Sequence, residues 1–201
     1  MMADPAASRR RRRTLAVLAI LVGGAIGIIG STQPWLDVVL RDGAQRHLSV
    51  AGADAVSVLA PLSLAALALG LALSIVGRVL RYVFGVLAVG LGVGMTAASL
   101  RIALGRPVDA VMSTVTEATG ISGLGPVAQI VETIATTPWP AVNAAAALLI
   151  VLGGVLCLVT AHTWPGSGRK YRQGTVGRDA RRPHDAIDSW DDLSRGEDPT
   201  R

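Results

Sequence analysis

Four long apolar stretches without Asp, Glu, Lys or Arg constrain this chain more than any other feature. They cover residues 15–35, 56–77, 82–100 and 139–161, and every charged residue lies between or beyond them. A helix needs about 20 apolar residues to cross roughly 30 Å of hydrocarbon, because each residue advances it by about 1.5 Å. All four stretches meet this length, so the sequence predicts an all-α membrane protein built on a four-helix transmembrane bundle.

The distribution of Lys and Arg predicts the orientation of this membrane domain, residues 15–161. Loops rich in Lys and Arg are retained in the cytoplasm. Fifteen of the 19 basic residues lie in segment 1–14, in the loop between the second and third stretches and in the tail 162–201. Four lie in the loops 36–55 and 101–138. We therefore expect a multi-pass protein of the cell (inner) membrane with both termini in the cytoplasm and these two loops outside.

The formal net charge of +5 follows from the same distribution. The basic clusters Arg9 to Arg13 and Arg169 to Arg172 adjoin apolar stretches, which is typical of contact with anionic lipid headgroups. This interpretation is favoured over nucleic-acid binding. A cleaved signal peptide is the alternative for the first stretch, which is however long for a signal sequence and has a poor cleavage pattern.

Aromatic residues lie at the ends of the apolar stretches, where a ring can be buried while its polar atom stays in water. Trp35, Tyr82, Trp139 and Trp164 are therefore predicted to be membrane-interface anchors. Stacking of a ligand on Trp35 or Trp139 is the sharper alternative. Within the stretches, glycines at small-xxx-small spacing predict close helix packing, and the same spacing allows a homo-oligomer.

The two outer loops carry different patterns. Asp42-Gly43 is a turn dipeptide between β-branched residues, which predicts a short outer β-hairpin of about 36–41 with 46–50. In the longer loop, apolar residues recur at helical spacing on both sides of a glycine-rich break at 120–126. This pattern predicts two amphipathic outer helices, whose apolar residues are Val108, Val111, Met112 and Val115, then Val127, Ile130, Val131 and Ile134.

Residues that could carry chemistry are sparse. Cys157 is the single cysteine, so no intramolecular disulfide and no cysteine-based metal cluster can form. A cation site could be built from the carboxylates of the longer outer loop, but solvated helix faces are the commoner arrangement. The histidines are far apart in the sequence, and the apolar stretches contain no group for a proton relay. No catalytic, cofactor-binding or metal-binding residue is therefore assigned, no cofactor is expected, and an enzyme is not expected; the residues concerned are Asp109, Glu117, Glu132, His47, His162 and His184.

The tail 162–201 is polar and predicted to be largely disordered, except near its end. There Ile187, Trp190 and Leu193 recur every three residues among aspartates, which indicates a short amphipathic turn of helix. A tryptophan in such a segment favours docking to a partner surface. These three residues are the candidate docking motif for a cytoplasmic protein.

Three short segments resemble a known family. They are Thr32-Gln33-Pro34-Trp35, then Trp164-Pro165 followed by Arg169 to Tyr171, and the terminal run 190–200. Together with the order of the four stretches, they resemble the actinobacterial membrane proteins associated with tryptophan-biosynthesis operons. The resemblance implies an inner-membrane protein genetically linked to tryptophan metabolism, and it implies no catalytic or binding residues.

These observations predict a non-enzymatic integral membrane protein, an accessory or scaffold linked to tryptophan metabolism that docks a partner through its C-terminal tail. The alternative is a transporter or exporter component for tryptophan, indole or a related aromatic solute. Four spans form a small pathway for such a solute, and proton coupling ordinarily needs a carboxylate within the membrane. The accessory role is therefore the preferred hypothesis.

Overall fold

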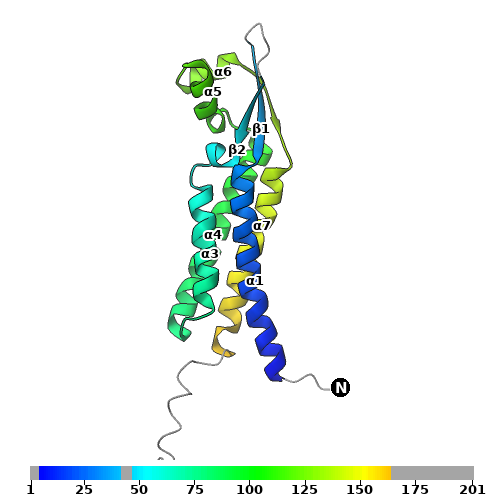
Figure 1. Cartoon of the computed structure of the whole chain (residues 1–201), viewed down its shortest axis with the longest axis vertical. Helices are drawn as coiled ribbons and strands as arrows, with labels where there is room; N and C mark the ends of the chain where they lie inside the picture. The colour runs from blue at the N-terminus through cyan, green and yellow to red at the C-terminus, as the bar shows by residue number, and fades with distance from the viewer. Residues whose placement is uncertain (1–4, 42–46, 164–201) are drawn as a thin grey trace, which may run out of the picture. The chain divides into compact units, whose positions relative to one another are not determined.

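The computed structural model describes the backbone of residues 5–41 and 47–163, and the side chains within 11–41 and 47–162 (Figure 1). The described residues belong to one compact unit that extends to Gly166. It consists of four apolar helices, a three-stranded sheet and several short helices. Most of the tail lies outside the described residues.

Three helices are long and apolar enough to cross a membrane. They are Arg11–Thr32 within α1 (Pro5–Thr32), α4 (Arg78–Gly105) and α7 (Trp139–Thr160). The apolar helix α3 (Leu59–Leu73) has 15 residues, or about 22 Å, which is less than the roughly 30 Å of hydrocarbon. By length and composition the described chain therefore has three candidate spans, and the predicted count of four is not confirmed.

The second apolar stretch, residues 56–77, is helical only in its middle part. Pro61 lies in the first turn of α3, where its missing N–H costs no helical bond. At the other end, the Ser74 hydroxyl donates a hydrogen bond to the Leu71 carbonyl oxygen. The chain then turns through Val76 and Gly77 into α4, so the turn between the two helices uses residues expected in the span.

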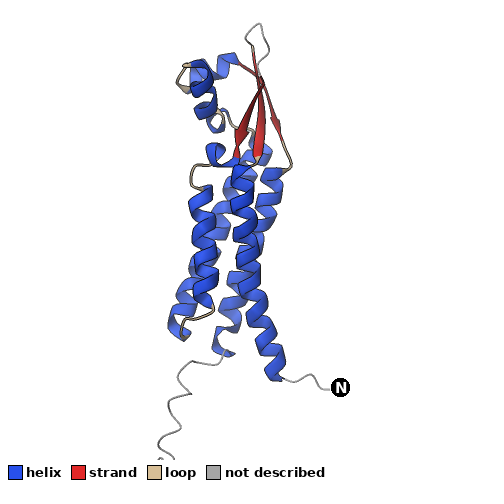
Figure 2. Ribbon diagram, viewed as in Figure 1, coloured by secondary structure: helices blue, strands red, loops and turns tan. Residues whose placement is uncertain are grey.

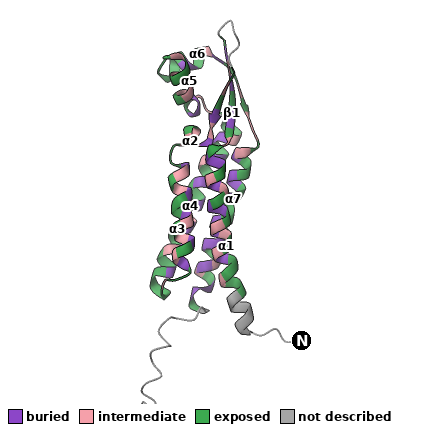
Figure 3. Cartoon of the chain, in the orientation of Figure 1, coloured by how far each residue is buried: buried purple, intermediate pink, exposed green. Residues whose placement is uncertain are grey.

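Glycines bring the backbones of the long helices into contact. A Cβ atom added at Gly23 of α1 would lie 2.6 Å from the carbonyl oxygen of Ala146 in α7. One added at Gly92 of α4 would lie 2.9 Å from the carbonyl oxygen of Ala147. Helix α1 thus packs against α7 on one side and α3 on the other, and α4 packs against α7 and α3. Figure 3 shows the buried residues of these helices as inward-facing stripes, with exposed residues on the outside.

The sheet has the strand order β2-β1-β3 and is antiparallel throughout (Figure 2). Its strands are β1 (Pro34–Leu40), β2 (His47–Ala51) and β3 (Val131–Thr136). In the central strand, Val38 is opposite Leu48 on one side and Ile134 on the other. The predicted hairpin is therefore present, with its turn outside the described residues. The third strand is an addition that the sequence analysis did not foresee.

Strand β3 corrects the second of the two predicted amphipathic helices, which was expected to continue through Val131 and Ile134. The helix ends at Ile130, and the next six residues form the strand. Val131, Thr133, Ile134 and Thr136 are β-branched, and such residues fit a pleated sheet better than a helix. The edge of β1 supplies the hydrogen-bond partners for this segment.

Short helices complete this end of the unit. They are α2 (Gly52–Ala55), the 3₁₀ turn η1 (Val108–Ala110), α5 (Met112–Thr119) and α6 (Leu124–Ile130). Gly120 has a φ of +73° and Gly123 a φ of +100°, so the predicted glycine break separates α5 from α6. Val111, Val115 and Val127 are buried in one cluster with residues of β1. We call the three strands and these short helices the cap, which Figure 1 shows beyond one end of the long helices.

Candidate interaction sites at the two ends of the helices

Trp35 connects the cap to helix α1. Its side chain is fully buried, and its Nε1 donates a hydrogen bond of 2.8 Å to the carbonyl oxygen of Gly30. Gly52 of α2 packs directly on this pair, because a Cβ there would lie 2.6 Å from Nε1 and 2.7 Å from the same carbonyl oxygen. The Thr137 amide also donates to the Trp35 carbonyl oxygen at 3.0 Å. One residue thereby holds α1, α2 and the end of β3 together.

The burial of Trp35 corrects its assignment as a membrane-interface anchor. Helix α1 ends at Thr32, and Trp35 is the second residue of β1 instead of the last residue of a span. Its ring faces the interior, so it contacts neither lipid nor an outer ligand. The Thr32-Gln33-Pro34-Trp35 segment is therefore the junction between helix and sheet.

The other predicted anchors have different surroundings. Tyr82 is 39% exposed in the first turns of α4. Trp139 is half-buried at the first residue of α7. Both positions are compatible with contact to a membrane interface, which stays a prediction. Trp164 lies outside the described residues.

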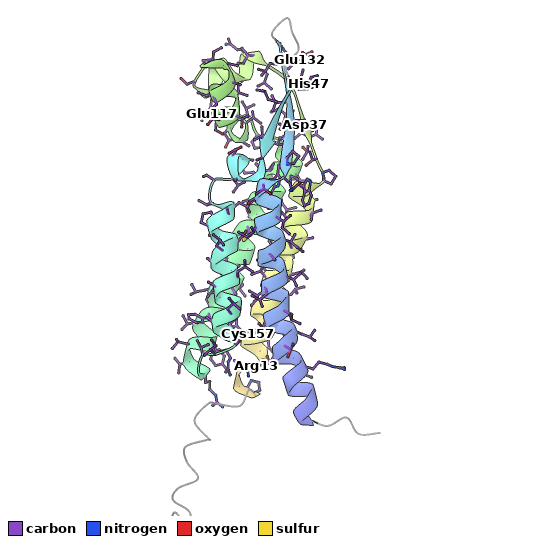
Figure 4. All side chains as sticks on the ribbon, viewed as in Figure 1. Arg13, Asp37, His47, Glu117, Glu132 and Cys157 are labelled. Atoms are coloured by element: carbon purple, nitrogen blue, oxygen red, sulfur yellow. The ribbon has the colours of Figure 1, made fainter. Side chains whose placement is uncertain are left out.

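The carboxylates of the cap do not gather into a cation site. Asp109 forms an ion pair with Arg101 of α4, with an N to O distance of 2.8 Å. Figure 4 labels Glu117 on α5 and Glu132 at the start of β3. Within residues 5–41 and 47–163, no group of three or more His, Cys, Asp or Glu side chains could hold a metal ion. His47 is an exposed residue at the start of β2.

A buried polar pair links α4 and α7 below the cap, and the sequence analysis missed it. Asn143 Nδ2 donates a hydrogen bond of 2.8 Å to Ser99 Oγ, which in turn donates to the Met95 carbonyl oxygen at 2.8 Å. Asn143 Oδ1 faces Gly30, since a Cβ added there would lie 3.2 Å from it. A lone asparagine near the start of an apolar stretch was the available signal, because such residues bond across helices in membranes.

The opposite end of the helices is basic, and we call it the arginine end after Arg13, Arg78 and Arg81. Arg13 of α1 donates a hydrogen bond to the Ser74 carbonyl oxygen. Arg81 is 3% exposed. It donates to the carbonyl oxygens of Val76 at 3.0 Å and Ala161 at 3.4 Å.

Arg78 is exposed and donates to the carbonyl oxygen of His162 at 3.4 Å. The acceptors of all three arginines are carbonyl groups that follow the ends of α3 and α7. The last carbonyl groups of a helix have no intrahelical partner, and cations are favoured beside them. The arginines therefore satisfy two helix ends and fasten α1 and α4 to them.

The arginine end includes only part of what the sequence analysis assigned to lipid and partner contact. The side chains of Arg11 and Arg12 are exposed on α1. Those of Arg9 and Arg10 are not described. The segment Arg169 to Arg172 and the docking residues Ile187, Trp190 and Leu193 lie outside the described residues. Cys157 is buried in α7, where its thiol contacts the carbonyl oxygen of Arg81 at 3.8 Å.

Apolar helices of membrane-spanning length, with arginines at one end and a mixed polar cap at the other, define a helical membrane protein. A family model described as "Tryptophan-associated transmembrane protein" matches residues 17–200, almost the whole chain. The protein therefore belongs to this family, which confirms the resemblance drawn from the sequence. Neither the curated proteins nor the solved structures compared with the chain gave a match.

Proposed function

We propose that this protein is a non-enzymatic accessory protein of the cell membrane, linked to tryptophan metabolism, which docks a cytoplasmic partner through residues 187–193. The close packing of its apolar helices is the observation that supports this role best. Backbone atoms of α1 and α7, and of α4 and α7, approach to distances that leave no room for a Cβ atom. A transport pathway between these helices would require such contacts to open.

The chemistry of the helices supports the same role. Residues 14–32, 59–77, 82–100 and 139–161 contain no Asp, Glu, Lys, Arg or His. The buried polar side chains Ser63, Ser99 and Asn143 donate hydrogen bonds within the bundle. Coupled transport ordinarily needs ionisable groups along the path. The polar surfaces of the protein are instead at its two ends, where a scaffold would meet its partners.

The sheet supports a topology with four membrane crossings. Strand β1 follows α1, strand β3 precedes α7, and the two strands pair directly. They must lie on the same side of the membrane, so the chain between them crosses an even number of times. Because α4 is long enough to span, α3 must cross in the opposite direction. With four crossings, the distribution of Lys and Arg directs both termini to the cytoplasm.

Helix α3 also extends along most of the bundle despite its short length. Near the cap, a Cβ atom at Gly27 of α1 would lie 2.5 Å from Ser63 Oγ. At the arginine end, Arg13 of α1 binds the carbonyl oxygen of Ser74, just beyond the last residue of α3. The polar turn at 74–77 and the arginines completes the distance that the 15-residue helix leaves, because long basic side chains can extend to the membrane interface.

Site-specific labelling tests this topology. In a Cys157→Ala background, single cysteines replace Asp42, Ser122 or Ser167, and intact cells are treated with a membrane-impermeant maleimide. We expect labelling at positions 42 and 122 from outside, and at position 167 only after permeabilisation. Labelling of positions 122 and 167 with the opposite accessibility would contradict the four-span topology.

Affinity capture with crosslinking from native membranes tests the docking role. The full chain is compared with a variant carrying Trp190→Ala and Leu193→Ala, and with Ser189→Ala as a matched control in the same segment. We expect the full chain and the control to retain a specific cytoplasmic protein and the double variant to lose it. Identical captures from all three would overturn tail docking and return transport of an aromatic solute as the hypothesis to test.

A further inference from the structure

Three arginines from two helices meet around the turn between α3 and α4. Arg13 of α1 binds the carbonyl oxygen of Ser74, and Arg81 of α4 binds that of Val76, two residues further along the same turn. Arg81 and Arg78 also bind the adjacent carbonyl oxygens of Ala161 and His162. The three guanidinium groups are therefore neighbours at one end of the bundle, and each is oriented by a backbone contact.

We propose that Arg13 and Arg78, held by this turn, form a binding site for the phosphate group of an anionic phospholipid. A guanidinium carries five N–H donors in a planar fork, and phosphate oxygens accept two of them at once. Arg78 is exposed and Arg13 half-buried, so both reach the surface, whereas the buried Arg81 acts as the support that positions the turn. The site is independent of the proposed docking role of the tail.

The apolar residues beside these arginines favour a lipid over a soluble phosphate. Ile75 is 80% exposed and Val79 is 74% exposed, and both belong to the same turn and the start of α4. Leu80 and Val83 continue this exposed apolar surface along the helix. A headgroup bound by the arginines would place its acyl chains along these side chains. A soluble phosphate would leave that surface uncovered.

The charge distribution of the described residues agrees with this assignment. Their carboxylates belong to the cap: Asp37 and Glu132 lie on strands, and Glu117 lies on α5. Figure 4 shows these three residues at one end and Arg13 at the other. The arginine end is therefore strongly positive, as expected for a surface that attracts anionic lipids.

Native mass spectrometry of the full-length protein in mild detergent, with defined lipids added, tests the site. Phosphatidylglycerol is compared with phosphatidylcholine, whose headgroup is neutral overall, and inorganic phosphate is added in a separate arm as competitor. The variants are Arg13→Gln and Arg78→Gln. Arg101→Gln is the matched control, because Arg101 is an exposed arginine at the cap end of α4. Circular dichroism verifies that each variant is folded.

The native protein is expected to retain phosphatidylglycerol over phosphatidylcholine. Each site variant should lower this preference roughly fivefold, since one arginine near a membrane surface contributes about that factor. Arg101→Gln should leave it unchanged, and inorganic phosphate should not displace the lipid. Arg78 is exposed, so Arg78→Gln tests the site even where Arg13→Gln fails to fold. An unchanged preference in Arg78→Gln overturns the site, and displacement by inorganic phosphate overturns its assignment to a lipid.

Discussion

The indole Nε1 of Trp35 donates a hydrogen bond to the carbonyl oxygen of Gly30 across the junction between α1 and β1. This bond turns the chain back on the last turns of the helix, and Gly52 of α2 covers it. The cap is consequently attached to the membrane helices by a packed contact as well as by the chain itself. The relationship explains why a tryptophan, a proline and a glycine occur where the first apolar stretch ends.

Replacing Trp35 with phenylalanine should destabilise the protein by about 1–3 kcal/mol. The substitution removes the N–H donor from a buried site and leaves a small cavity. The free energy of unfolding, measured by titration with dodecyl sulfate in mixed micelles, gives the comparison. Trp139→Phe is the control, because Trp139 is half-buried. Equal losses in the two variants would show that the Gly30 bond has no particular role.

Substituting alanine for Gly52 should loosen the cap from the helices. The new Cβ would lie 2.6 Å from Trp35 Nε1 and 2.7 Å from the Gly30 carbonyl oxygen, so one of these groups must move. We expect a loss of about 1–3 kcal/mol, typical of overpacking, and faster proteolysis within the cap. Gly125→Ala is the matched control, because a Cβ there would meet nothing within 4 Å. Identical cleavage of the two variants would argue against the clamp.

The sequence was informative where hydrophobicity alone determines structure. The long apolar helices, the hairpin and the glycine break between α5 and α6 follow from periodicity and turn residues. Strand β3 could not be read in this way, because its pairing partner β1 is almost 100 residues away. The same holds for Trp35, whose position at the end of an apolar stretch is typical of an interface anchor, while its burial depends on contacts from α2 and β3.

Glycine spacing shows the same limit within the bundle. Gly23 and Gly27 of α1, and Gly90 and Gly94 of α4, share the small-xxx-small pattern. The first pair packs against neighbouring helices, whereas a Cβ at either residue of the second pair would meet nothing within 4 Å. Spacing reveals that a helix has a smooth face, and only the tertiary structure reveals whether that face is used.

This difference predicts opposite outcomes for one kind of substitution. Gly23→Ala should destabilise the protein by about 1–3 kcal/mol, because its Cβ would overlap the backbone of α7. Gly94→Ala should leave stability unchanged or raise it by up to about 1 kcal/mol, since alanine favours helix over glycine. Unfolding in mixed micelles measures both. A loss of stability for Gly94→Ala as large as that for Gly23→Ala would contradict the helix packing described above.

The buried pair of Asn143 and Ser99 allows a double-mutant cycle between α7 and α4. Asn143→Ala, Ser99→Ala and the double variant remove the two partners separately and together. Because Asn143 donates to the Ser99 hydroxyl at 2.8 Å, the two substitutions should not be additive. A coupling energy of about 0.6 kcal/mol is expected, the average for hydrogen bonds between membrane helices. As control, Ser63→Ala paired with Asn143→Ala should give additive losses, because Ser63 bonds within α3. Additive losses for Asn143 and Ser99 as well would mean that this bond contributes nothing to the association of α4 with α7.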